Sequence, residues 1–411
     1  MDLPHVRNHF SRFNVSLTPF DQSPFTSKYI DFNTGILQNP SSSDPTQALG
    51  ILAQQLQKYS YLTTGYNLTV PIEEELLLPF GEFVEKYNIQ AAVPYAHIFA
   101  HGVGDLLKSP SLYVFQNFGL PQLTMLRNGA KGGVRKIHQI DILTYFVDLI
   151  QNFHIFRESY LIRNTDFVII QYMTTAHHSN SDLYLAASKL LGSNVLYSST
   201  AISIERSADK KSPHRIIVQT PTGNRTILAK HLLITIPPAL ENLAPLDMTE
   251  EESLLFKQWQ WTTYYAGIVR GGIPDGVSLI NFANSTTYNV PLPPYVRNFD
   301  FSGVSGLHTF QTISLSSQSP EDVRNMVTSP IALMNERGTF ASGAATVEIL
   351  SNHSPIAMRV TPDSIRSGFY KDLYSLQGCL GTFWTGAAWA QDNSSLLWAF
   401  TEGVMEQIIA E

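Results

Sequence analysis

The chain has 411 residues, of which 44% are hydrophobic and 15% are charged, and this apolar content excludes an intrinsically disordered protein. Its formal net charge is −7, and no cluster of Lys and Arg is large enough to bind nucleic acid. A chain of this length is expected to form two or three domains. Cys379 is the only cysteine, so neither a disulfide framework nor a cysteine-based metal site is expected.

The sequence contains no targeting or membrane signal. The N-terminal MDLPHVRNHF lacks the apolar core of a signal peptide, and the apolar run Ile142 to Ile150 is too short to cross a bilayer. We therefore expect no membrane span and, for the chain as encoded, a cytoplasmic location. Six Asn-x-Ser/Thr sequons are nevertheless typical of a glycoprotein with secretory relatives. They begin at Asn14, Asn67, Asn224, Asn284, Asn352 and Asn393.

Helical patterns dominate the segment that follows the turn-rich first 45 residues. A helix is predicted from Thr46, with Asp44 as its cap and Pro45 in its first turn. Its apolar face comprises Leu49, Leu52, Leu56 and Tyr59. The next helical pattern starts at Pro71 and is broken at Pro79, and a third covers Gln139 to Phe156.

The period changes to that of β-strands at about Asn194. An alternating strand is followed by a hairpin about Thr220 to Asn224, then by a buried apolar strand that ends at Pro237-Pro238. A second β-rich block covers Trp259 to Gln318. A helix from Pro320 and a strand over Ala344 to Ser351 follow.

Several familiar site patterns are incomplete in this sequence. In AHGVGDLL (Ala100 to Leu107), Leu107 replaces the third glycine of a phosphate loop, so a turn is the favoured interpretation. His97 and His101 have the spacing of half a zinc site, but no third ligand lies nearby in the sequence. The loop pair His177-His178 likewise lacks a third ligand, and no Gly-x-Ser-x-Gly nucleophile motif is present. Metal and hydrolase sites are therefore not expected.

The C-terminal stretch FWTGAAWAQDNSSLLWAFTEGV has the form of a strand, a small-residue turn and a capped helix. Small residues from Gly386 to Ala388 allow the backbone to approach a flat ligand closely, and Asn393 is a candidate cap. The apolar stripe of the helix comprises Leu397, Phe400, Val404 and Ile408. The N-terminus of such a helix would stabilise negative charge on a bound group. The alternative is a terminal helix that merely packs after a buried strand.

This stretch resembles the C-terminal flavin-binding motif of the flavin-containing amine oxidase superfamily. The matching residues are Gly386, Ala387 and Ala388 at the strand end, and Thr401, Glu402 and Gly403 on the helix. The paired strands that end at Pro237 are similar to the meander of the same superfamily, in which the first strand contacts the FAD adenine, here at about Ala201. Where relatives have Gly-Gly-Asn before a helix, this chain keeps Asn180.

Within that superfamily, the chain most resembles fungal FAD-dependent oxidoreductases of secondary metabolism, of the β-cyclopiazonate dehydrogenase kind. The resemblance implies an α/β or α+β fold: a glutathione-reductase-like FAD domain, incomplete here, interleaved with a helical and mixed-sheet substrate domain. It places FAD-domain segments at 1–45, 176–245 and 366–411, and substrate-domain segments at 46–175 and 246–365. It also implies FAD as the cofactor.

The implied activity is a two-electron oxidation of a polycyclic or prenylated small molecule, such as a terpenoid or alkaloid, with oxidative ring closure as one outcome. Trp261, Tyr264 and Tyr265 are the expected substrate-pocket residues, with core packing as the alternative for each. The sequence identifies neither a catalytic acid nor a catalytic base, and it does not indicate an oligomeric state.

One departure from the superfamily is large. Its members begin with a strand, a Gly-x-Gly-x-x-Gly turn and a helix that hold the pyrophosphate of FAD, and this pattern is absent from the present sequence. The first residues resemble the region just after that unit. The alternative expectation is therefore a truncated, catalytically empty flavoprotein remnant or a partner subunit.

Overall fold

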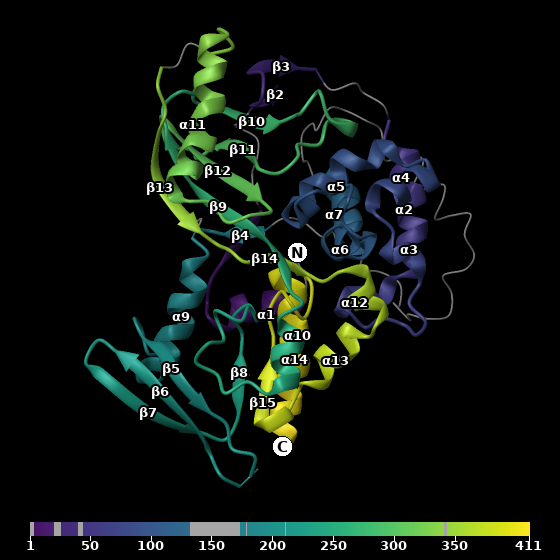
Figure 1. Ribbon diagram of the computed structural model, residues 1–411. Coiled ribbons are helices and arrows are strands. Elements are labelled where there is room, and N and C mark those ends of the chain that lie inside the picture. Colours follow the sequence, from purple (N-terminus) through teal and green to yellow (C-terminus); the bar gives the residue numbers. More distant parts are fainter. Residues whose placement is uncertain are drawn as a thin grey trace.

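The computed structural model describes residues 4–19, 26–39, 44–131, 173–177, 179–209, 211–340 and 343–411. In the view of Figure 1, a large sheet with α11 (Pro320–Glu336) lies at the upper left and a block of helices at the right. The C-terminal helix α14 (Ser394–Ala410) and a small sheet lie below them. These are the mixed α and β elements that the sequence predicts, and the fold class is confirmed.

The helical block forms where the sequence predicts helices. Helix α2 (Thr46–Lys58) begins after Asp44, whose Oδ1 accepts a hydrogen bond from the Thr46 amide at 2.9 Å. The predicted apolar stripe from Leu49 to Tyr59 is buried. The predicted break at Pro79 separates α3 (Glu74–Leu77) from α4 (Phe80–Tyr87). The expected helix over Gln139 to Phe156 lies outside the described residues.

Further short helices belong to this block, and two of them, α12 and α13, come from the C-terminal part of the chain. They are η1 (Ser60–Thr64), η2 (Gln90–Ala92), α5 (Val93–Ala100), η3 (His101–Val103), α6 (Ser111–Asn117), α7 (Leu120–Lys131), α12 (Pro362–Arg366) and α13 (Phe369–Ser375). Two short 3-10 helices follow other turns, η5 (Thr287–Asn289) and η6 (Cys379–Gly381).

The large sheet has eight strands within the described residues, in the order β13-β9-β12-β11-β10-β2-β3, with β14 also paired to β9. Its strands are β2 (Thr26–Asp31), β3 (Ile36–Gln38), β9 (Gln260–Arg270), β10 (Val277–Asn281), β11 (Tyr295–Phe301), β12 (Leu307–Ser314), β13 (Thr346–Asn352) and β14 (Ile356–Arg359). Strand β2 pairs with β10 in parallel, so part of the first 45 residues belongs to this sheet.

The three-stranded meander comprises β5 (Thr200–Glu205), β6 (His214–Thr220) and β7 (Gly223–Ala229). The β6–β7 turn lies at the predicted hairpin position. Strand β8 (Leu232–Ile234) follows and pairs in parallel with β15 (Thr382–Trp384). The expectation of a buried strand is wrong for β8, because all three of its residues are half-buried. Within the described residues β8 belongs to a two-stranded sheet, which leaves it incompletely covered.

The remaining elements connect the meander and the terminal helix to the rest. They are α1 (Pro4–Arg12), β1 (Leu17–Pro19), β4 (Met173–Thr175), α9 (Ser181–Leu191), η4 (Gly192–Asn194) and α10 (Glu250–Phe256). Strands β1 and β4 pair with each other.

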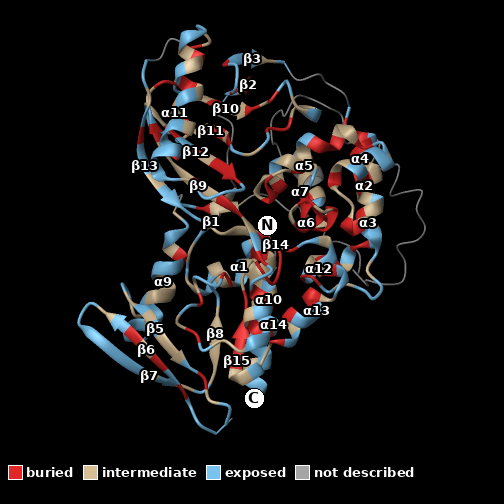
Figure 2. Cartoon of the chain, viewed as in Figure 1, coloured by how far each residue is buried: buried red, intermediate tan, exposed pale blue. Residues whose placement is uncertain are grey.

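Two hydrophobic cores hold the described parts together, and their buried residues are red in Figure 2. The larger core fills the helical block and reaches Trp384 and Trp389 of the C-terminal stretch. The smaller core lies between the large sheet and α11, whose apolar stripe includes Val323 and Ile331, both 0% exposed. The C-terminal motif is therefore anchored in the helical core.

Candidate functional site

The two motifs singled out in the sequence meet at the ends of two neighbouring strands. Because β8 and β15 are parallel, their carboxyl ends lie at the same edge, and the Thr385 amide donates to the Ile234 carbonyl at 3.0 Å. Gly386 follows with φ +125°, and a Cβ on it would lie 3.1 Å from the Thr235 carbonyl oxygen. Ligands of α/β sheets bind outside the carboxyl ends of parallel strands. This edge is therefore a candidate ligand site.

The terminal helix begins at Ser394, after the small-residue turn, with the predicted cap in place. Asn393 Oδ1 accepts hydrogen bonds from the amides of Ser395 and Leu396 at 3.1 and 3.4 Å. The predicted stripe faces inward: Val404 is buried, and its companions Leu397, Phe400 and Ile408 are half-buried. Since the cap occupies two terminal donors, the helix offers mainly its dipole to a bound group.

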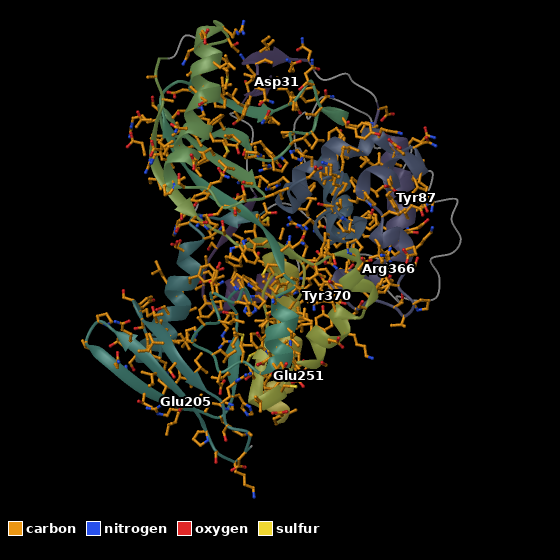
Figure 3. The ribbon with its side chains drawn as sticks, in the orientation of Figure 1. Asp31, Tyr87, Glu205, Glu251, Arg366 and Tyr370 are labelled. Atoms are coloured by element: carbon orange, nitrogen blue, oxygen red, sulfur yellow. The ribbon has the colours of Figure 1, made fainter. Side chains whose placement is uncertain are left out.

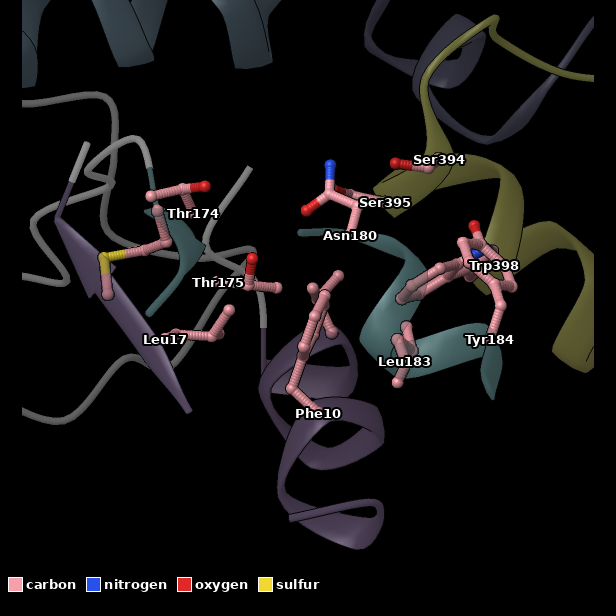
Figure 4. Close-up of a pocket in the computed structure, with 12 residues that line it drawn as sticks. Phe10, Leu17, Thr174, Thr175, Asn180, Leu183, Tyr184, Ser394, Ser395 and Trp398 are labelled. Atoms are coloured by element: carbon pink, nitrogen blue, oxygen red, sulfur yellow. The ribbon is translucent and has the colours of Figure 1, made fainter. Parts of the chain in front are cut away.

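A cavity of about 170 Å³ lies at the start of this helix, between α1, β1, β4, α9 and α14. Figure 4 shows Asn180 beside Ser395, with Thr174 and Leu17 across the cavity. Asn180 precedes α9 and makes no side-chain cap hydrogen bond, so its amide remains available. The N-termini of α9 and α14 both border the cavity, which favours a ligand with negative charge.

The C-terminal motif is tied to the helical block by one hydroxyl group. The Tyr374 hydroxyl donates to the Trp389 carbonyl and accepts from the Tyr66 amide, both at 2.6 Å. Trp389 also stacks on Trp384, with ring centroids 5.7 Å apart. These contacts fix the segment between the strand end and the helix.

The expected FAD-binding residues fall into several groups in the structure. Gly386 and Ala387 are half-buried and lie near the turn of Pro237, whose carbonyl accepts bonds from Ala239 and Asn242, whereas Ala388 is buried in the core. Ala201 is half-buried on β5, an outer strand of the meander, beside a register shift.

The helix element of the motif lies far from the start of α14. Glu402 is eight positions after Ser394, roughly 12 Å along the axis. Its exposed carboxylate lies 3.6 Å from His9 of α1, and no atom would meet a Cβ on Gly403 within 4 Å. Thr401, by contrast, is hydrogen-bonded to Thr385 at the strand end. The structure brings Thr401, Gly386 and Pro237 into one region and leaves Glu402 and Gly403 on an open helix face.

The expected substrate-pocket residues lie on different faces of β9. Tyr265 is buried in the core under α11, and its hydroxyl donates to the Gln318 carbonyl at 3.0 Å. Tyr264 is half-buried on the opposite face, as strand alternation requires. Trp261 is half-buried against the helical core. The structure therefore does not bring these three aromatic side chains together.

Around Tyr264 lie polar residues that the sequence analysis did not single out. Burial raises the pKa of Tyr264; the Arg297 charge lowers it, and the Asp392 charge raises it. Desolvation by surrounding protein raises the pKa of Asp392 although its side chain reaches solvent. Asp392 lies between the small-residue turn and α14. A charge of the C-terminal motif therefore affects the pKa of Tyr264 on the large sheet. A charged residue inside the apolar strand pattern YVRNFDF was the signal that could have identified Arg297.

Three buried polar atoms of the C-terminal stretch have no hydrogen-bond partner among the described residues. They are Oε1 of Gln391 and the indole nitrogens of Trp384 and Trp389. Unpaired buried polar atoms cost free energy and therefore often mark sites that are completed by another group. Both tryptophans are 0% exposed in the helical core, and Gln391 lies in the loop before α14.

The histidines that the sequence suggested as half a metal site are engaged in packing. The His97 ring lies 5.9 Å from the Tyr295 ring, and His101 contacts the Ile98 carbonyl. No group of three potential metal ligands occurs among the described residues. Within those same ranges, no helix combines the length and apolarity that crossing a membrane would require.

Comparison with solved structures places this fold. The CLA-producing fatty acid isomerase of P. acnes superposes with a TM-score of 0.69 at 14% identity, over 98% of this chain and 83% of that chain. Cyclohexylamine oxidase of Brevibacterium oxydans gives a TM-score of 0.52 at 11% identity, over 98% and 86%. The chain therefore shares its fold with these two proteins.

Sequence comparison identifies the family. No protein-family model matches the chain. A β-cyclopiazonate dehydrogenase of Aspergillus flavus is 32% identical over 98% of this chain and 79% of its own length. An FAD-dependent oxidoreductase of Cochliobolus heterostrophus is 29% identical over 97% and 77%. The chain belongs to the fungal FAD-dependent oxidoreductases, the family that includes β-cyclopiazonate dehydrogenase, as the sequence motifs predict.

Proposed function

We propose that the chain binds FAD and catalyses a two-electron oxidation of a polycyclic or prenylated small molecule of fungal secondary metabolism, with oxidative ring closure as one outcome. The observation that carries this proposal is the parallel pairing of β8 with β15. That pairing sets the Gly386 turn beside the Thr235–Pro237 turn, and the Thr385–Thr401 hydrogen bond joins this edge to the capped helix α14. Membership of a family of FAD-dependent oxidoreductases supports the same conclusion.

The residues at this edge fit FAD in their chemistry. Gly386 and Ala387, with the dipole of α14, would approach the isoalloxazine, and Gln391 and Trp389 supply unpaired polar atoms. Thr401, Glu402 and Gly403 would form the helix contact implied by the family motif, and Ala201 with Pro237 the meander contact. Asn180, beside the N-terminus of α14, would bind an anionic part of the cofactor. We likewise propose that segments 176–245 and 366–411 contribute the FAD domain, together with the part of segment 1–45 that precedes β2, because β2 and β3 belong to the large sheet.

Bound FAD supplies the two-electron acceptor, and the protein side chains orient the substrate and exclude water. On the substrate side, Tyr264 lies on the face of β9 opposite the α11 core. Burial raises the pKa of Tyr264, and the charge of Asp392 raises it further. Trp261 extends the apolar surface toward the helical block. We propose that these two side chains border the substrate, whereas Tyr265 supports the sheet from its core face.

A titration of the purified chain with FAD tests this proposal. We expect the visible flavin spectrum to sharpen and shift on binding, and the flavin to remain with the protein through gel filtration. Asn180→Ala should weaken FAD binding about tenfold without loss of stability, because the side chain makes no cap bond. Asn67→Ala, at an exposed position, is the matched control. A folded chain that stays colourless with excess FAD would overturn the proposal and favour a catalytically empty protein or partner subunit.

A further inference from the structure

The large sheet carries a half-buried guanidinium that no carboxylate neutralises at close range. Arg297 of β11 donates to Gln311 Oε1 at 2.6 Å and to the Ile98 carbonyl at 3.2 Å. Among the ion pairs of the described residues, none includes Arg297 within 4.0 Å. Two of its five N–H groups are thus bound to neutral oxygens. A charge held this way normally has an anionic partner, because desolvating an unpaired charge is costly.

A β-bulge decides which way Arg297 faces. Val296 pairs with Thr312 and Asn298 pairs with Gln311, so Arg297 is the extra residue between them. Val296 and Phe299 are both buried in the core under α11, at 2% and 0% exposure. Strict alternation cannot bury two residues that are three positions apart, and the extra residue resolves this conflict. Arg297 therefore lies on the other face of the sheet, away from α11.

That second face also carries Gln311 and Tyr264. Gln311 pairs with Ala266 of β9, and Tyr264 is two residues before Ala266 on the same strand. The Tyr264 hydroxyl is influenced by both Arg297 and Asp392. Arg297 is thus placed on the same side of the sheet as Tyr264 and Gln311. Bulges are common next to active sites because they redirect a side chain.

The titratable group that acts on Arg297 most strongly is Asp300. Burial lowers the pKa of Arg297 and the Asp300 charge raises it; burial raises the pKa of Asp300 itself, and this carboxyl is bonded to Asn298 rather than to Arg297. Burial and the Arg297 charge lower the pKa of His97 to about 3, and the pKa of His101 is lowered by the same causes. Both histidines are therefore neutral around pH 7, and the tyrosines Tyr264 and Tyr295 keep their protons because burial raises their pKa values. The two histidines and two tyrosines therefore add no charge beside Arg297.

We propose that Arg297, oriented by Gln311, binds a carboxylate group of the substrate and so selects acidic substrates. This inference rests on the proposed function, since it names the substrate class of the same site. The planar guanidinium suits a flat anion with two oxygens, to which it can donate two parallel hydrogen bonds. The apolar remainder of the substrate would lie along Tyr264.

The test compares two probes of the same shape, naphthoate and its uncharged amide naphthamide, by equilibrium dialysis with and without saturating FAD. The wild-type chain should bind naphthoate about tenfold or more tightly than naphthamide. Arg297→Gln should abolish this preference, and Arg297→Lys should keep part of it, because the charge remains but the fork is lost. Arg270→Gln is the matched control, since Arg270 is exposed at the end of β9 and pairs with Glu348 at 2.8 Å.

Equal binding of the two probes by the wild type would overturn the inference, as would an unchanged preference in Arg297→Gln. Circular dichroism establishes whether Arg297→Gln is folded. If it is not folded, the Arg297→Lys variant decides: an undiminished preference for naphthoate over naphthamide in that variant would overturn the inference. The flavin spectrum of the same samples separates the two proposals. If the chain binds FAD but binds naphthoate and naphthamide equally, only the inference about Arg297 is contradicted. If the chain prefers naphthoate but never binds FAD, only the oxidoreductase proposal is contradicted.

Discussion

The Thr385 hydroxyl donates a hydrogen bond to the Thr401 hydroxyl over 2.7 Å, because the single Thr401 proton is already donated to the Leu397 carbonyl at 2.8 Å. Thr385 directly follows β15 and is 4% exposed, whereas Thr401 lies in the third turn of α14. This pair connects the strand edge to the terminal helix inside the candidate cofactor site.

Substituting one member of this pair should destabilise the fold more than substituting both. Thr401→Val leaves the buried Thr385 hydroxyl without a partner and should lower the free energy of unfolding by about 1–2 kcal/mol. The double variant Thr385→Val with Thr401→Val should recover part of that loss. Urea denaturation of the two single variants and the double variant gives the coupling energy. Strict additivity would show that the two hydroxyls do not interact.

A buried ion pair joins the meander to α10. Arg206 donates two bonds of 2.6 Å to Glu252 and one of 2.8 Å to Asp247, and the Arg206 and Glu252 side chains are 0% and 2% exposed. Figure 3 shows the neighbouring Glu251 on α10 and Glu205 on the meander.

Arg206→Met should lower the free energy of unfolding by about 3–5 kcal/mol, because it leaves the Glu252 carboxylate buried without its partner. Arg215→Met is the control, since Arg215 pairs with Glu205 at 3.1 Å with both side chains about half exposed. That change should cost about 0–1 kcal/mol. Chemical denaturation with the same probe compares them, and similar losses for both variants would contradict the assigned role of Arg206.

The two motif glycines should respond oppositely to alanine. Gly386 has φ +125°, and a Cβ would lie 3.1 Å from the Thr235 carbonyl, so Gly386→Ala should cost about 1–3 kcal/mol. Gly403 lies inside α14 with nothing within 4 Å, so Gly403→Ala should raise stability by about 0.5–1 kcal/mol.

Thermal melts without FAD measure the stability of these two glycine variants, and a flavin titration of Gly403→Ala gives a second readout. If Gly403 contacts the cofactor as proposed, the more stable variant should bind FAD more weakly than the wild type. Unchanged affinity would remove Gly403 from the cofactor site while leaving Gly386 in it.

Acid should destabilise the helical block through Glu75. Burial opposes ionisation of this carboxylate, but hydrogen bonds from Lys86, Tyr87 and Tyr59 lower its pKa from 4.5 to about 2. Its folded-state pKa is lowered, so its stabilising contribution is present above about pH 4.5 and is lost as the pH falls toward 2.

Glu75→Gln should lower the free energy of unfolding by about 2 kcal/mol at neutral pH and by much less near pH 3. Urea denaturation at both pH values measures the difference. Glu82→Gln, at an exposed position on α4, is the control and should change neither value appreciably. Equal losses at the two pH values would show that the Glu75 charge does not stabilise the fold.

Local features of the sequence predicted much of the secondary structure. The spacing of Leu49, Leu52 and Leu56 defined the buried face of α2, and Pro79 marked a helix break because its nitrogen cannot donate a hydrogen bond. The turn between β6 and β7 and the Asn393 cap also lie where they were expected. Each of these signals depends on residues within a few positions of one another.

The candidate site depends on contacts between distant segments, which no local pattern encodes. The sequence contained the Gly386 turn and the Pro237 turn, and their resemblance to a flavoprotein family indicated the cofactor. Only the parallel register of β8 with β15 placed Gly386 against Thr235. Similarly, the family resemblance implied Tyr264 and Tyr265 as residues of one substrate pocket, but strand alternation sends them to opposite faces. The bulge at Arg297 follows from burying Val296 and Phe299 in one core, and that is a property of the folded sheet rather than of the strand sequence.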